Sequence, residues 1–149
     1  MMRAILVTVM LLAVATAPAT GISSTGALFA NLGIGLVSAI GGTAVSLSVI
    51  GELAPTFEPR FAKIAVVVGS LTICGGLGGS FGVLVAGRLF GIDGNVRGCL
   101  LGGLGGGLLS AFTEPIAYAL ALPPAFAELL GFVMLPTLPA VGATLGYNR

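Results

Sequence analysis

The chain alternates long apolar runs with short polar connectors. Residues 27–51 contain no charged side chain over 25 positions, and residues 64–87 contain none over 24 positions. Between these runs, residues 52–63 carry four charges and two prolines. An uncharged apolar run of about 18 residues or more is long enough to cross a bilayer. The pattern therefore predicts two membrane-spanning helices.

The last third of the chain is also apolar, but prolines interrupt it. After residue 97 the only charged side chains are two glutamates and the C-terminal arginine. A Pro-Pro pair at 123–124 divides this region, so we expect a third span near residues 98–122 and a fourth near residues 125–147. Two prolines inside the fourth span, Pro136 and Pro139, predict a kink.

The third predicted span contains the tripeptide Thr113-Glu114-Pro115. Threonine is a good N-cap residue, an acid is favoured in the first helical turn, and proline is tolerated early in a helix. The tripeptide therefore indicates a helix restart. A re-entrant or broken third helix is the main alternative to a continuous span.

The first 19 residues have the order of a secretory signal peptide. Arg3 precedes an apolar core over residues 4–15, and small residues follow, with an A-x-A-like cleavage site that ends at Ala19. We expect a signal peptide or a signal-anchor helix over residues 1–19, followed by a single membrane domain over residues 20–149. The lysine and arginine counts of the connectors do not select an orientation.

Composition places the chain among membrane proteins. Hydrophobic residues make up 56% of the 149 residues, charged residues make up 7%, and the mean hydropathy is +1.14. Soluble domains carry about 25% charged residues. The net charge of +1 offers no basic surface for nucleic acid. We therefore predict an all-α membrane protein, a four-helix transmembrane bundle whose partner is the lipid bilayer.

Small residues recur at four-residue spacing in every predicted span, in a glycine-zipper pattern. This spacing lets helix backbones approach closely, which favours helix association in lipid. The first span carries small-residue stripes at 38, 42 and 46 and at 35, 39 and 43. We expect packing within the chain, in a homo-oligomer or against another membrane protein. The glycines concerned in the other spans are Gly75, Gly78, Gly79, Gly82, Gly98, Gly102, Gly106, Gly142 and Gly146.

The sequence lacks the usual parts of an enzyme site. It contains no histidine, and its two cysteines, Cys74 and Cys99, lie singly in apolar runs. A metal-ligand cluster, a Cys/His pair and a Ser/His/Asp set are all missing from the sequence. We predict a protein that is not an enzyme and that has no catalytic residue, metal or cofactor.

The strongest polar candidate is Glu114, which lies deep in an apolar stretch. An acidic residue at membrane depth is costly and is a functional-site hypothesis by default. Three interpretations remain open. Glu114 is a residue of a helix N-terminus near the interface, a coupling site for protons or cations, or one partner of an ion pair with Arg88 or Arg97.

The connector over residues 88–97 is predicted to form a hairpin at the membrane surface. Arg88 and Asp93 can pair across a turn that contains two glycines. A contact of Arg88, Asp93 and Arg97 with a lipid headgroup or a protein partner is the alternative.

The chain resembles small, uncharacterised bacterial envelope proteins with a signal peptide and glycine-zipper transmembrane segments. The resemblance rests on the predicted signal segment, the glycine-rich spans, GVLVAGRLFGIDGNVRGCLLGG over residues 82–103 and PAVGATLGYNR over residues 139–149. It implies a location in the bacterial inner (cell) membrane. We expect a non-enzymatic structural or assembly component of the envelope. The alternative is a small channel, pore former or transporter with Glu114 on the conduction path.

Overall fold

The computed structural model describes residues 24–149, so the predicted signal segment lies outside the described residues. The described part of the chain is helical throughout, apart from short connectors. Its elements are α2 (Ser24–Leu53), the 3-10 turn η1 (Ala54–Thr56), α3 (Arg60–Ser70), the π-helical turn η2 (Leu71–Gly75), α4 (Gly76–Leu89), α5 (Val96–Ala119) and α6 (Pro124–Tyr147).

Four helical stretches are long and apolar enough to cross a membrane, and the protein is an all-α membrane protein. Because α3, η2 and α4 join end to end, they form one of these four stretches. The stretches are Thr25–Thr56, Arg60–Leu89, Val96–Ala119 and Pro124–Tyr147. Each contains one of the predicted spans, except that the third ends three residues before residue 122.

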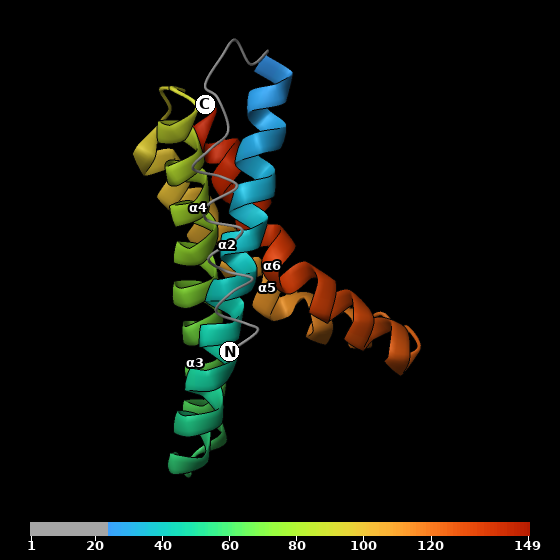
Figure 1. The fold of residues 1–149 in the computed structure, drawn as a ribbon. Coiled ribbons are helices and arrows are strands. Elements are labelled where there is room, and N and C mark those ends of the chain that lie inside the picture. Colours follow the sequence, from blue (N-terminus) through green and yellow to red (C-terminus); the bar gives the residue numbers. More distant parts are fainter. Residues whose placement is uncertain (1–23) are drawn as a thin grey trace, which may run out of the picture.

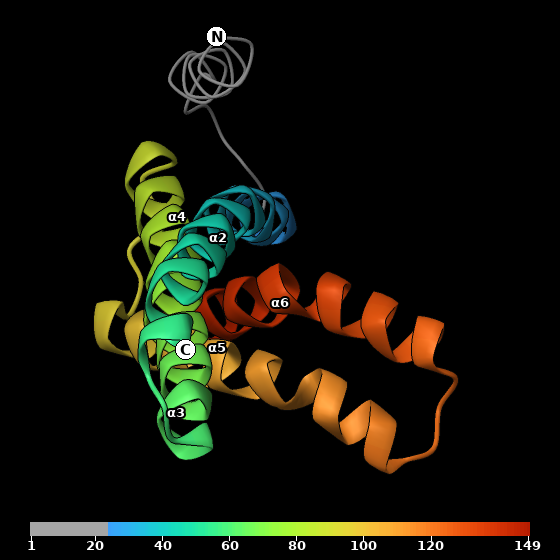
Figure 2. The ribbon, with the colours of Figure 1, turned by 90° about the horizontal axis from the view of Figure 1, so that it is seen from below.

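The helices pair as two antiparallel hairpins that cross each other. In Figure 1, α2 runs beside the rod made of α3, η2 and α4, and α5 runs beside α6. The Val96 end of α5 and the Tyr147 end of α6 pack against α4, whereas their other ends project to the side, as Figure 2 shows. The four-helix bundle is therefore closed at one end and splayed at the other.

The predicted helix restart at Thr113 is wrong, because α5 continues through this residue and through Pro115. The Thr113 hydroxyl does not cap a new helix. It donates a hydrogen bond of 3.2 Å to the carbonyl oxygen of Leu109, one turn earlier in the same helix. In lipid, neighbouring helices and hydroxyl side chains help a helix to tolerate an internal proline.

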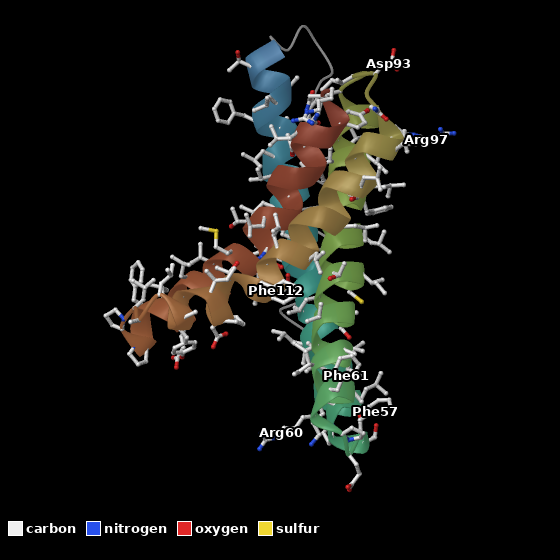
Figure 3. The ribbon with its side chains drawn as sticks, turned by 180° about the vertical axis from the view of Figure 1, so that it is seen from behind. Phe57, Arg60, Phe61, Asp93, Arg97 and Phe112 are labelled. Atoms are coloured by element: carbon white, nitrogen blue, oxygen red, sulfur yellow. The ribbon has the colours of Figure 1, made fainter. Side chains whose placement is uncertain are left out.

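Helix α6 changes direction partway along its length in Figure 3. It contains two internal prolines, Pro136 and Pro139, each of which removes one N–H donor from the helix. The bend agrees with the kink expected from these prolines.

The core of the protein is made of small side chains. Among residues 24–149, Val83 is the largest side chain that is fully buried, and most other buried residues are glycine, alanine, serine or threonine. Most large apolar side chains are exposed or half-buried, and Phe61, Phe132 and Leu101 are 82%, 73% and 72% exposed. This distribution suits a protein whose outer surface meets lipid tails and whose helices associate through close packing.

Candidate functional site

Helices α5 and α6 touch backbone to backbone along a seam of glycines. A Cβ atom added at Gly102 would overlap the carbonyl oxygen of Gly142, and one added at Gly98 would overlap that of Gly146. A third contact places Gly106 against the carbonyl oxygen of Leu138. The structure thus brings the predicted glycines of the third and fourth spans together.

A second seam joins α2 to the rod. A Cβ atom at Gly82 would lie 2.6 Å from the Ile34 carbonyl oxygen, and one at Gly78 would lie 2.9 Å from the Ser38 carbonyl oxygen. Gly42 faces the Cys74 backbone in the same way. The stripe predicted at 38 and 42 in the first span therefore packs against the second span of the same chain.

Helix α4 and the η2 turn also present glycines to the second hairpin. A Cβ atom at Gly79 would lie 2.9 Å from the Pro139 carbonyl carbon, and one at Gly75 would lie 3.9 Å from the Pro139 ring. On another face of α4, a Cβ atom at Gly76 would lie 2.8 Å from the Gly103 carbonyl oxygen. The rod therefore contacts α2, α5 and α6 on three faces.

Two buried serines bridge these seams. Ser80 donates to the carbonyl oxygen of Gly76 at 2.9 Å and to that of Cys99 in α5 at 3.1 Å. Ser46 in α2 donates to the carbonyl oxygen of Ser70 in α3 at 3.0 Å. Interhelical hydroxyl bonds of this kind stabilise packing in membranes.

Tyr147 holds the connector between α4 and α5. Its hydroxyl donates to the Ile92 carbonyl oxygen at 2.6 Å, and its own carbonyl oxygen accepts from the Asn95 N–H at 2.8 Å. The tyrosine ring fills the space beside Gly87 and Gly94. Sequence reasoning missed this contact because Tyr147 lies at the far end of the chain from the turn that it stabilises.

The predicted ion pair across this connector is wrong. Within the described residues, Arg88 forms no ion pair with Asp93. Asp93 and Arg97 point away from one another at this end of the molecule in Figure 3. Tyr147 lies against the glycines of the turn and anchors it from α6, so the turn is held together without an ion pair.

Glu114 lies on a groove between the splayed hairpin and the first two spans. The groove has a volume of about 410 Å³ and is mostly apolar. Glu114 packs over Gly131 of α6, where an added Cβ would lie 3.0 Å from the Glu114 Cβ. The remaining lining residues are Leu47, Ile50, Val67, Leu71, Ser110, Ala111, Pro115, Tyr118 and Leu135.

The proposed ion pair of Glu114 with Arg88 or Arg97 is also wrong. Neither arginine pairs with Glu114 in the part of the chain that the structure describes. Arg97 lies near the start of α5, so Glu114 is about 25 Å further along the helix axis. The Glu114 carboxylate is therefore left in the groove without a cationic partner among the described residues.

A second glutamate joins this region, which the sequence did not predict. Tyr118 donates to a carboxylate oxygen of Glu128 at 3.5 Å. Helix α6 begins at Pro124 and has no acid in its first turn, so Glu128 lies beyond the N-terminal turn of this helix. The partner of this carboxylate is therefore a side chain of the facing helix.

Irregular backbone lies along the same groove. The η2 turn, which contains Leu71, is π-helical, and π-helical turns are frequent at functional sites. Pro115 supplies no N–H to the carbonyl group of Ala111, and Pro139 supplies none to that of Leu135. Backbone that departs from the regular helix is tolerated at membrane depth where it meets protein or lines a cavity.

Three side chains, those of Asn31, Thr43 and Thr72, have buried polar atoms without a hydrogen-bond partner in the described structure. The side chain of Asn31 in α2 is fully buried, and neither its amide nitrogen nor its carbonyl oxygen forms a hydrogen bond. No spacing signal in the sequence distinguishes Asn31 from the surrounding apolar residues.

No protein-family model matches the sequence, and neither the curated proteins nor the solved structures contain a significant match.

Proposed function

We propose that the protein is a non-enzymatic structural or assembly component of a bacterial envelope, located in the inner (cell) membrane. The observation that carries the proposal is the set of backbone contacts between glycines, above all the contact of Gly102 with Gly142. Such contacts make a rigid unit out of four helices. A rigid unit with a large apolar outer surface suits a scaffold in a membrane.

The packed half of the molecule supports a scaffold rather than a pore through one chain. Its middle is filled by direct contacts, such as Gly79 with the backbone of Pro139 and Gly76 with the backbone of Gly103. Polar groups there form short hydrogen bonds, as Ser80 does. The groove at Glu114 lies outside this packed half and has room for a solute.

The scaffold proposal is tested with two glycine variants of the full chain. Gly102→Leu should destroy the α5–α6 seam, whereas Gly105→Leu should not, because no atom lies within 4 Å of a Cβ added at Gly105. The experiment compares the two variants in a deletion strain of the source organism, using envelope permeability and recovery of the protein from membranes. Equal rescue by both variants, or no envelope defect on deletion, would contradict the proposal.

The second candidate function is a small channel or transporter that uses the groove. It is favoured by the position of Glu114, an acid without a cationic partner beside irregular backbone. An ionisable group in a membrane helix normally faces protein or a water-filled cavity. A carboxylate placed in this way could bind a proton or a cation during transport.

A flux assay separates the two candidates. Purified protein in liposomes is tested for proton and sodium leak, with empty liposomes and the Glu114→Gln variant as controls. A leak that Glu114→Gln abolishes supports the transport candidate. Flux no greater than that of empty liposomes eliminates it and leaves the scaffold proposal in place.

A further inference from the structure

The groove at Glu114 has one polar edge and apolar walls. The polar edge belongs to α5, where Ser110, Glu114 and Tyr118 line the groove. Because these residues follow one another at four-residue spacing, they share one face of the helix. The walls come from α2, the rod and α6 and carry no charged side chain. They are made of Leu47, Ile50, Val67, Leu71, Gly131 and Leu135.

The groove is deep enough for a small molecule and is open to it. Leu71, Ser110 and Gly131 are buried, whereas Leu47 and Glu114 are exposed at the rim. Figure 2 shows the reason, because the α5–α6 hairpin diverges there from α2 and the rod. The volume of about 410 Å³ falls within the range of about 300–1,000 Å³ that is usual for small-molecule sites. A ligand can therefore reach the Glu114 carboxylate without separating the helices.

The groove lies at membrane depth. Leu47 belongs to the uncharged run of residues 27–51, and Val67 belongs to that of residues 64–87. Val67 lies about 10 Å along the helix axis from Arg60, the first residue of α3. The walls of the groove are therefore inside the apolar part of the first hairpin.

The charge beside the groove is negative and unbalanced. Lys63, one turn before Val67 in the rod, is exposed, and no basic side chain of the described residues forms an ion pair with Glu114. The carboxylate of Glu128, which accepts the Tyr118 hydrogen bond of 3.5 Å, adds a second negative charge at this edge. A carboxylate in apolar surroundings favours a ligand that brings a positive charge.

The walls decide which kind of cation fits. A divalent cation such as calcium takes about six to eight oxygen ligands, and residues 24–149 contain no group of three or more acidic, histidine or cysteine side chains that could hold a metal. Leucine and valine walls instead gain free energy when a ligand covers their apolar surface. The ring of Tyr118, one turn after Glu114, can also contact an organic cation. The groove therefore suits a cation that carries its own apolar body.

We propose that the groove binds a lipophilic organic monocation. Its positive charge lies beside the Glu114 carboxylate, and its apolar body covers Leu47, Val67 and Leu71. The proposal rests on the transport candidate, because it names the ligand class of the same groove, and it is independent of the scaffold proposal.

The test measures binding of two probe ions of opposite charge. The full chain in dodecyl maltoside is dialysed to equilibrium against tetraphenylphosphonium or against tetraphenylborate, an anion of nearly the same size and shape. Micelles without protein give the uptake by detergent, which is subtracted. Tetraphenylborate should bind at least about tenfold more weakly than tetraphenylphosphonium, because it meets the Glu114 carboxylate with a like charge. Equal binding of the two ions would overturn the proposal.

Two pairs of variants locate the bound cation. Glu114→Gln should weaken tetraphenylphosphonium binding at least about tenfold, whereas Glu58→Gln, in the charged connector, should change it by less than about twofold. Parent-like binding by Glu114→Gln would overturn the proposal.

The second pair fills the groove instead of removing its charge. Leu47→Trp should also weaken binding at least about tenfold, because the larger side chain occupies the groove. Val45→Trp is the control, since Val45 and Leu47 are 54% and 51% exposed in the same helix but only Leu47 lines the groove. SDS titration checks that both tryptophan variants keep the stability of the parent protein. Equal binding by the two would overturn the proposal.

The flux assay described above distinguishes this proposal from the transport candidate. Glu114-dependent binding of tetraphenylphosphonium without any flux supports the cation site and eliminates transport. A proton or sodium leak that Glu114→Gln abolishes, in a protein that does not bind tetraphenylphosphonium, overturns the cation site and leaves the transport candidate in place.

Discussion

At the scale of single residues, glycines decide where the helices touch, because a glycine has no side chain. Gly102 and Gly142 lie so close that neither position has room for a Cβ atom. Gly105 lies in the same helix but faces outward, with no atom within 4 Å of an added Cβ. The same residue type therefore has a packing role at one position and none at a position three residues later.

Gly102→Leu should destabilise the protein by about 3 kcal/mol, because the new side chain meets backbone atoms that cannot move aside by rotation. The free energy of unfolding is measured by SDS titration of the protein in mild detergent. Gly105→Leu and Leu101→Ile, both at exposed positions, should each change it by less than about 0.5 kcal/mol. A small loss of unfolding free energy in Gly102→Leu would contradict the close contact of α5 and α6 at this position.

Two turn residues adopt a left-handed conformation. Their substitution should change the stability of the protein in opposite directions. Gly91 has φ of +63°, with open space around it, and Ala121 has φ of +56°. Gly91→Ala should therefore cost about 1 kcal/mol, because a Cβ atom is strained in this conformation. Ala121→Gly should stabilise the turn by up to about 1 kcal/mol. The measurement is the midpoint temperature of thermal unfolding of both variants in detergent. Shifts of this midpoint in the same direction would contradict these backbone conformations.

At the scale of elements, the ends of helices are held by contacts from distant parts of the chain. Asn95 caps α5 by accepting a hydrogen bond of 2.9 Å from the Gly98 N–H. Its own N–H reaches the carbonyl oxygen of Tyr147 at the end of α6. The connector between α4 and α5 is thereby tied to the last helix of the protein.

Tyr147→Phe removes the hydroxyl that bonds to Ile92 and should cost about 1 kcal/mol. The backbone amides of residues 92–95 should then exchange with deuterium faster than in the parent protein. Tyr118→Phe is the matched control, because its hydroxyl forms a longer, exposed bond. Equal effects of the two substitutions would show that Tyr147 does not anchor the connector.

At the scale of the whole molecule, the rod is the element that unites the two hairpins. It contacts α2 through Gly78 and Gly82 and contacts α5 and α6 through Gly76 and Gly79. One serine bond reinforces each side, from Ser46 to Ser70 at the end of α3 and from Ser80 to Cys99 of α5. The far ends of α5 and α6 lack such contacts with the rod, and there the groove opens.

The two serine bonds should contribute independently to the stability of the whole molecule. Ser46→Ala and Ser80→Ala should each cost about 0.6 kcal/mol, and the double variant should cost their sum within about 0.5 kcal/mol. SDS titration of the three variants checks this expectation. Ser48→Ala is the control, since the Ser48 hydroxyl is exposed and bonds only within its own helix. A large departure from additivity would mean that the two hairpins do not pack as separate units.

The sequence by itself determined the fold class and the approximate position of the four helices. Whether a segment is apolar enough to cross a bilayer depends on the residues within that segment, so uncharged runs and prolines mark the helices locally. The spacing of Gly98, Gly102 and Gly106 likewise marks one helix face. Spacing alone does not identify which helix packs against that face, because α4 also carries small residues, and it carries them on several faces.

Only the tertiary structure decided which faces meet and where the hairpins separate. It paired Gly102 with Gly142, continued α5 through Pro115 and placed Glu114 on an open groove. It also replaced the expected pair of Arg88 and Asp93 with an anchor from Tyr147. These outcomes depend on contacts between residues far apart in the chain, where close packing selects one arrangement among several that the local pattern allows.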